Sequence, residues 1–330
     1  MRLIPLALAA LSTVTAASDA NYKISGPYTH SNLSVYLVHA QERTTEKTYV
    51  TLDDAMDHGL VIVYETSNVN TLLIANVSKE EVYIQSGDIV KGGKQDRVVK
   101  EDMILQSLSG KVPIDVFCVE HDRWTQRGNE ASGKFISSKQ AISGNKMKIA
   151  VRSDANQREV WDKVAEAQQR LSSNLKAPVQ SSQSASSFQL TLESSKVRES
   201  SRAYESALAP LIEKYKDAVG YVVAVNGKVT SADVYANHSL FRKLWPKLIA
   251  SAAVEAIGAD HTVAAAPPPS HDEIKAVMAG PKDAKPATAQ QVNERTEVRK
   301  RESEKAVMFE TRDAKEGAAG SAVHRSYVVK

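Results

Sequence analysis

Cysteine is almost absent from this sequence. The 330 residues contain one cysteine, Cys118, so no disulfide can form within the chain. Cys118 lies among Val116, Phe117 and Val119, where we expect a free thiol to pack as a small apolar side chain. A nucleophilic cysteine needs an activating partner, and the sequence identifies none. If the protein is exported, the lack of disulfides fits a bacterial periplasm or exterior better than a eukaryotic secretory route.

Aromatic residues and an excess of one charge are also scarce. Aromatic side chains make up 6% of the chain, which argues against a protein that stacks sugars. Lys and Arg number 42 against 39 Asp and Glu, whereas nucleic-acid binders usually carry a clear basic excess, so we expect no nucleic-acid partner. No apolar stretch beyond the N-terminus is long enough to cross a bilayer, so we expect no membrane span.

Common catalytic motifs are missing as well. No Gly-x-Ser-x-Gly nucleophile elbow is present. The eight histidines are scattered without the spacing of a zinc site, so we expect neither a metal nor a cofactor. His238 and His324 adjoin strand or helix ends, although a lone histidine is more often structural than catalytic. The sequence therefore specifies no reaction.

Residues 1–20 have the features of a secretory signal. Arg2 is followed by an apolar run at residues 3–11 that is too short to span a membrane. Small residues come next, and they place the expected cleavage after Ala17 or Ala20. We therefore expect a protein exported to the bacterial periplasm or the extracellular space.

Residues 21–150 predict an all-β region. Short runs rich in valine, isoleucine and tyrosine alternate with turn formers. The predicted strands are 33–38, 49–52, 60–64, 71–77, 81–85, 89–90, 98–99, 103–105 and 112–119. Many short strands at regular spacing are typical of an antiparallel sandwich or barrel. We expect only a helical turn at 53–58 and a loop over 126–145 to interrupt the series.

Residues 151–330 predict helices, a hairpin and a terminal strand pair, which makes the fold class α+β. Helical periodicity covers 160–175, 197–215 and 239–257, with a capping box at Asp154 and Gln157 and a kink or restart at Pro210. Asn226-Gly227 between 221–225 and 228–235 predicts a hairpin with a type I′ turn. An Ala/Pro-rich flexible segment is expected at 264–291, around a short helix at 272–278, and a solvated charged face at 294–305. The strands at 306–311 and 323–329 are expected to dock onto the hairpin.

The densest run of glycine and charge occupies residues 86–97. Gly92 and Gly93 accept positive φ, and they predict a turn whose backbone N–H groups can hold an anion. Lys94 would add positive charge beside that turn, and Arg97 could grip a carboxylate or phosphate with two hydrogen bonds. The run is not a Walker loop, because an extra glycine displaces the lysine and a glutamine replaces the hydroxyl residue. The alternative is a charged hairpin turn without a ligand.

A second polar cluster follows the last predicted strand of the all-β region. In an extended chain, Glu120 and Asp122 point to the same side, because successive side chains alternate. They form a candidate carboxylate pair, while Arg123 and Trp124 could make a cation–π contact. Asp88, in the glycine-rich run, is a third candidate acid, base or metal ligand. The alternative is a strand end that leaves the core and turns polar.

Three segments together resemble a known family. They are residues 87–97, residues 112–124, and the late pair 309–313 with 324–326. They are similar to the ARG and rhodanese-phosphatase-superfamily-associated protein domain. The resemblance covers most of the chain after the signal, so it implies that residues 21–150 and 151–330 form one family domain. The family name records genomic association with enzymes of ADP-ribose and phosphate, which implies a phosphate-bearing or ADP-ribose-like ligand.

These observations favour an exported binding module for a small anionic ligand or a protein partner. The expected ligand-binding residues are Gly92, Gly93, Lys94, Gln95, Arg97, Arg123 and Trp124. One alternative is a hydrolase, assisted by a metal or not, that uses Asp88, Glu120 or Asp122. Another is a structural or interaction protein of the cell envelope, which predicts a large exposed apolar patch.

Overall fold

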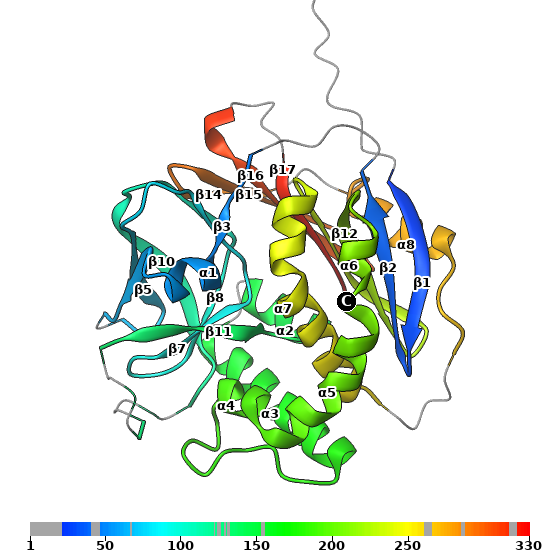
Figure 1. Cartoon of the computed structure of the whole chain (residues 1–330), viewed down its shortest axis with the longest axis horizontal. Helices are drawn as coiled ribbons and strands as arrows, with labels where there is room; N and C mark the ends of the chain where they lie inside the picture. The colour runs from blue at the N-terminus through cyan, green and yellow to red at the C-terminus, as the bar shows by residue number, and fades with distance from the viewer. Residues whose placement is uncertain are drawn as a thin grey trace, which may run out of the picture.

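The structure is a computed structural model with helices and strands mixed along the chain. It describes residues 22–40, 47–66, 68–121, 123, 127–128, 130, 133–152, 156–260, 266–284, 288–316 and 322–330. Within these residues the strands form sheets of eight, six and three strands, and helices pack between and beneath them (Figure 1). The predicted fold class, α+β, is confirmed.

The largest sheet joins the two ends of the chain. In spatial order its strands are β1 (Lys23–His30), β2 (Leu33–His39), β12 (Ala218–Val225), β13 (Lys228–Tyr235), β17 (Ala322–Val329), β16 (Ala306–Asp313), β15 (Thr296–Glu302) and β14 (Thr288–Asn293). All neighbours in this sheet are antiparallel. The N-terminal hairpin β1–β2 therefore belongs to the same sheet as the C-terminal strands.

Two smaller sheets hold all of the described strands between residues 50 and 141. The six-stranded sheet has the order β11 (Phe135–Ala141), β7 (Asp88–Gly92), β8 (Arg97–Val99), β10 (Gly110–Cys118), β5 (Thr71–Asn76) and β4 (Val61–Tyr64). The three-stranded sheet has the order β3 (Val50–Thr51), β6 (Val82–Ile84) and β9 (Met103–Leu105). Only the β3–β6 pair among the described strands is parallel.

The helices are short except for α3, α5 and α7. Their bounds are α1 (Leu52–Asp57), α2 (Asn145–Arg152), α3 (Gln157–Leu175), α4 (Phe188–Glu193), α5 (Ser195–Leu208), α6 (Leu211–Lys214), α7 (His238–Ile257) and α8 (His271–Ala279), with a 3₁₀ helix at Ala314–Glu316. In the described part of the chain, no helix is both long and apolar enough to cross a membrane.

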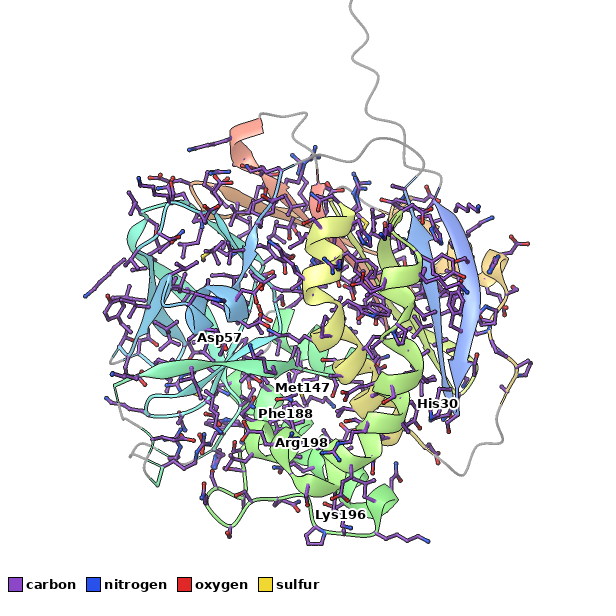
Figure 2. All side chains as sticks on the ribbon, in the orientation of Figure 1. His30, Asp57, Met147, Phe188, Lys196 and Arg198 are labelled. Carbon is purple, nitrogen blue, oxygen red and sulfur yellow. The ribbon has the colours of Figure 1, made fainter. Side chains whose placement is uncertain are left out.

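Helix α7 stands at the centre of the molecule, between the large sheet and the smaller sheets (Figure 1). Its Phe241 and Trp245 are buried against Tyr221 of β12, with Phe241 nearly parallel to the tyrosine ring and Trp245 at its edge. Burying a side chain of this size contributes about 1.5–3 kcal/mol. The opposite face of the large sheet packs against Ile274 and Met278 of α8. Side chains fill the interior between these layers (Figure 2).

Most of the elements predicted from the sequence are present. The turn between β12 and β13 has positive φ at both Asn226 and Gly227, as a type I′ turn requires. The terminal strands dock onto this hairpin as expected, because β17 pairs with β13. Helix α5 ends before Pro210 and α6 begins after it, so the predicted restart is confirmed.

Four described strands, β1, β11, β14 and β15, lie where the sequence predicted none. The loop prediction for residues 126–145 is wrong at β11, which pairs with β7 across a register shift. Strand β14 begins inside the range predicted as flexible, because β15 offers it an antiparallel partner. The N-cap of α3 is Asn156, whose side chain accepts a hydrogen bond from the Glu159 backbone; the predicted cap residue, Asp154, lies outside the described residues.

Candidate functional site

The predicted anion-binding turn exists between β7 and β8, and its donors face carboxylates of the protein itself. Gly92 and Gly93 have φ of +119° and +54°, the region that favours glycine. The backbone N–H of Gly92 donates to Asp96 Oδ1 at 2.9 Å, and that of Lys94 donates to Glu65 Oε2 at 2.8 Å. The turn therefore does bind anionic groups, and Asp96 and Glu65 supply them.

Arg97 is completely buried at the start of β8. Its Nε donates to the Val69 carbonyl at 3.1 Å and its Nη1 to the Gln95 carbonyl at 2.7 Å. Its Nη2 lies 3.7 Å from a carboxylate oxygen of Glu65. This guanidinium ties the turn to a neighbouring loop, and an external ligand could reach it only if the turn rearranged.

Gln95 and Cys118 are partners in the same interior. The Cys118 thiol donates to Gln95 Oε1 at 3.0 Å, and Gln95 Nε2 donates to the Glu120 carbonyl at 3.0 Å. Burial raises the pKa of the Cys118 thiol to about 11, so the thiol stays protonated at neutral pH. The expectation that Cys118 packs in the core is confirmed.

The second motif folds against the first through a cluster of two carboxylates and two guanidinium groups, Asp96, Glu120, Arg123 and Arg127. Arg123 Nε lies 2.7 Å from Glu120 Oε1, and Arg127 Nη1 lies 2.7 Å from Asp96 Oδ2 and 3.2 Å from Glu120 Oε1. Both carboxylates are fully buried. Burial alone would lower the pKa of Arg127, but Asp96 raises it above its usual value. The cluster therefore balances its charges internally.

The two candidate acids that the structure describes, Asp88 and Glu120, do not form one site. Asp88 Oδ1 is 2.8 Å from Lys247 Nζ, on α7, and not in the cluster around Glu120. Burial raises the pKa of Asp88, whereas Lys247 opposes that shift. Asp122 and Trp124 lie outside the described residues. Within those residues, no three His, Cys, Asp or Glu side chains come together as metal ligands.

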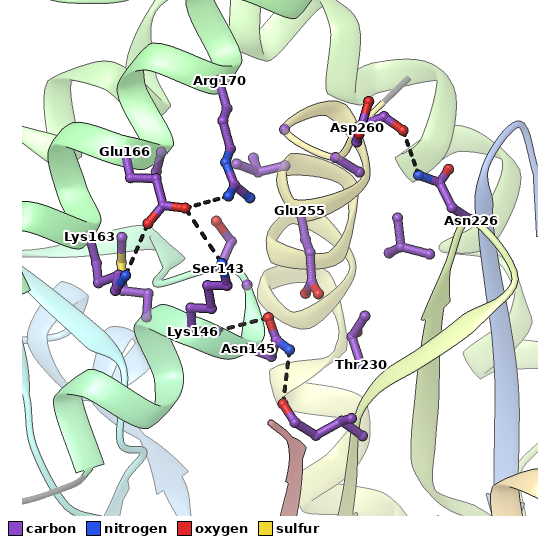
Figure 3. A pocket seen from close by; sticks show the side chains of 18 of the residues that line it. Ser143, Asn145, Lys146, Lys163, Glu166, Arg170, Asn226, Thr230, Glu255 and Asp260 are labelled. Atoms are coloured by element: carbon purple, nitrogen blue, oxygen red, sulfur yellow. Dashed lines mark hydrogen bonds and ion pairs between the residues drawn. The ribbon is translucent and has the colours of Figure 1, made fainter. Parts of the chain in front are cut away.

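A cavity of 530 Å³ lies elsewhere, in a place that the sequence analysis did not identify. Five elements build it: the start of α2, the middle of α3, the β12–β13 turn, the end of α7 and the end of β17. Figure 3 shows α3 on one side, the hairpin on the other and Glu255 of α7 projecting between them. Its volume is within the range of small-molecule sites.

One wall of the cavity concentrates positive charge around a single carboxylate. Glu166 of α3 accepts from Lys163 Nζ at 3.0 Å, forms an ion pair with Arg170, and lies 3.7 Å from Lys146 Nζ. Lys228, on the hairpin, also lines the cavity. Three cations share one carboxylate, so this wall keeps a surplus of positive charge.

The other walls are mainly apolar and carry two acidic side chains, Glu255 and Asp260. Glu255 is partly buried at the cavity floor. Burial raises the pKa of its carboxyl, while Lys148, the Thr230 hydroxyl and the Gly144 backbone N–H pull it back down. The apolar lining consists of Met147, Ala167, Leu171, Val225, Val229, Val254, Ala259 and Val329. A sequence signal was available, because Glu255 is the only charged residue in the last two turns of α7.

Comparison with known proteins gives a family and nothing more specific. A family model described as the ARG and Rhodanese-Phosphatase-superfamily-associated Protein domain matches residues 21–328. No curated protein and no solved structure shows significant similarity to the chain. The match spans nearly all of the described residues, including both motifs and most of the cavity lining. The chain therefore belongs to the ARG and Rhodanese-Phosphatase-superfamily-associated Protein domain family.

Proposed function

We propose that this protein is a binding module for a small organic anion, and that the cavity of 530 Å³ is its binding site. The observation that carries the proposal is the combination of mainly apolar walls with surplus positive charge on α2 and α3 around Glu166. By contrast, the donors of the Gly92–Gly93 turn already hold internal carboxylates. Binding of an external anion at that turn stays a prediction and would require displacement of Glu65 or Asp96.

The chemistry of the lining defines the ligand class. An apolar body would lie on the valine, leucine and methionine side chains. A carboxylate, sulfonate or phosphate would compete with Glu166 for Lys146, Lys163 and Arg170. A hydroxyl or N–H group of the ligand would donate to Glu255.

The test uses 1-anilinonaphthalene-8-sulfonate, because this probe combines an aromatic body, a sulfonate and an N–H donor. We expect fluorescence titration to show saturable binding to the native protein. The double variant Lys146→Gln/Arg170→Gln should weaken it by about tenfold or more, since charge-assisted hydrogen bonds contribute about 1.5–3 kcal/mol and ~1.4 kcal/mol is tenfold. Glu255→Gln should also weaken it.

The matched control is Lys275→Gln. Lys275 is an exposed lysine of α8, which covers the opposite face of the large sheet. Circular dichroism and unfolding curves would verify that all variants keep the native fold. Equal affinity of the control and the double variant for the probe would refute the proposal.

Export is a separate part of the proposal, and residues 1–20 support it by their sequence alone. Expression of the full chain in a bacterial host should yield a mature N-terminus just after residue 17 or 20. Mass spectrometry of the N-terminal peptide measures this. Recovery of the uncleaved chain from the cytoplasm would contradict it.

A further inference from the structure

A second cavity, of 420 Å³, lies between α1, β11, α5 and α7. It shares only Val254 with the first cavity. Its lining is mainly polar, with charged side chains from both long helices. Neither of the two sequence motifs lines this cavity. Asp88 is connected to it only indirectly, because Asp88 pairs with Lys247, which does line the cavity.

Two arginines on α5 face this cavity. Arg198 and Arg202 are exposed and four residues apart, so they lie one above the other on the same face of the helix. In the part of the chain that the structure describes, neither guanidinium has an ion pair within 4.0 Å or a side-chain hydrogen bond. Two adjacent guanidinium groups can bind the oxygens of one phosphoryl group together.

The facing helix contributes two lysines with the same spacing. Lys243 and Lys247 of α7 both line the cavity, and α7 packs against α5. Lys247 is neutralised, because its Nζ lies 2.9 Å from Asp53 and 2.8 Å from Asp88. Lys243 Nζ donates to the Tyr49 carbonyl at 2.6 Å, which leaves its charge without a carboxylate partner among the described residues.

Two carboxylates complete the lining. Asp54 of α1 and Glu205 of α5 face the cavity with no ion pair within 4.0 Å in the described structure. Glu205 follows Arg202 by three residues on α5, so the cavity carries both signs of charge on neighbouring positions. A ligand that carried only an anion would leave both carboxylates without a counter-charge. A ligand that also carried an ammonium group would satisfy both signs.

We propose that this second cavity binds a small phosphate ester that carries an amino group. Its phosphoryl group would lie on Arg198 and Arg202, with Lys243 nearby, and its ammonium group would face Asp54 or Glu205. The proposal does not depend on the first cavity. It assigns a polar ligand to a polar cavity, whereas the first cavity has apolar walls.

The experiment is isothermal titration calorimetry with phosphoethanolamine and with ethyl phosphate, which lacks the amine. We expect the native protein to bind phosphoethanolamine more tightly than ethyl phosphate. The double variant Arg198→Gln/Arg202→Gln should lose about tenfold or more in affinity for both. The matched control is Lys196→Gln, on the same helix but outside the cavity lining; both Lys196 and Arg198 are labelled in Figure 2.

A second variant tests the other end of the ligand. Asp54→Asn/Glu205→Gln should abolish the preference for phosphoethanolamine while ethyl phosphate still binds. Glu255→Gln, in the first cavity, should change neither affinity. No binding of either ester at millimolar concentration would overturn the proposal, and so would equal binding by the arginine variant and its control. Loss of binding in Glu255→Gln would place the ester in the first cavity and would also overturn it.

Discussion

At the scale of single residues, the interior of this protein contains a histidine that lies between two carboxylates. His324 Nδ1 lies 2.7 Å from Asp102 Oδ2, and its Nε2 lies 3.2 Å from Asp233 Oδ1. Burial would lower the pKa of His324, but the two carboxylates raise it above its usual value. The other titratable groups around this triad are Tyr83, Tyr235, Arg152 and Lys148. We therefore expect a charged imidazolium in the core at neutral pH.

This triad predicts how stability depends on pH. The contribution of His324 is complete below its unfolded-state pKa of 6.5 and is lost as the pH rises through the higher folded-state pKa. Asp102 and Asp233 have lowered pKa values, so their contribution is present above the usual aspartate range and is lost on acidification. His324→Gln should cost about 3–5 kcal/mol at pH 6 and remove the alkaline decline. Urea unfolding between pH 6 and 9 measures both.

The control for this prediction is His58→Gln, because His58 is exposed at the end of α1. Its curves should follow those of the native protein at every pH. An unchanged alkaline decline in the His324 variant would show that another group causes it.

The glycine-rich turn leads to a second prediction at this scale. Arg97→Ala would remove a buried guanidinium. The carbonyls of Val69 and Gln95 and the Glu65 carboxylate would then lose this donor inside the protein. We expect it to lower the free energy of unfolding by about 3–5 kcal/mol. Lys94→Ala keeps the backbone N–H that donates to Glu65, so its cost should be about 1 kcal/mol or less. Chemical denaturation of the two variants compares them, and equal costs would contradict a structural role for Arg97.

At the scale of elements, the β12–β13 hairpin is positioned by close contact at its turn. A Cβ on Gly227, at φ +75°, would lie 2.6 Å from the Ala266 side chain and 2.8 Å from the Pro267 carbonyl. Gly110 also has positive φ, +65°, but a Cβ there would meet nothing within 4 Å. A substituted side chain would therefore be strained by the positive φ at either position, but only at Gly227 would it also collide with neighbouring atoms.

This difference separates two costs of replacing glycine. Gly110→Ala should cost about 1–2 kcal/mol, from left-handed backbone strain alone. Gly227→Ala should cost more, because the segment at Ala266 must also move. The same change should weaken probe binding in the first cavity, since the hairpin forms one of its walls. Thermal unfolding and the fluorescence titration measure the two effects, and equal unfolding costs would contradict this account.

At the scale of the whole molecule, ion pairs and a shared core join the sheets. Arg295, before β15, pairs with Asp313 of β16 at 2.7 Å and with Glu81 beside β6. Lys247 of α7 reaches Asp88 of the six-stranded sheet. One continuous core contains residues of β7, β8 and β10 together with α7 and β12. The smaller sheets also have a hydrophobic cluster of their own, but the shared core and the ion pairs couple them to the large sheet.

We accordingly expect the sheets to unfold as one cooperative unit. Tryptophan fluorescence reports partly on Trp245, which is buried in α7, and far-ultraviolet circular dichroism reports on all elements. The two denaturation curves should coincide. Native-state hydrogen exchange should give β5 and β12 amides similar opening free energies. Two separated transitions would instead indicate independent domains.

The sequence alone determined the local elements and the chain-wide class. Runs of Val, Ile and Tyr predicted most strands. Asn226-Gly227 predicted the hairpin turn, because positive φ at two adjacent positions is a local property of the backbone. The late strand pair was also predicted to dock onto this hairpin, and β17 pairs with β13. The sequence did not predict strand β11, because its exposed polar residues are typical of a loop. Only pairing with β7 makes this segment a strand.

Only the tertiary structure decided what the charges do. The sequence showed that residues 86–97 carry lysine, arginine and aspartate, but it could not show that Glu65 and Asp96 occupy the turn. Both cavities bring together side chains from distant elements, so no local pattern announces them. A charge acts on whatever lies within a few ångströms, and folding alone sets that neighbourhood.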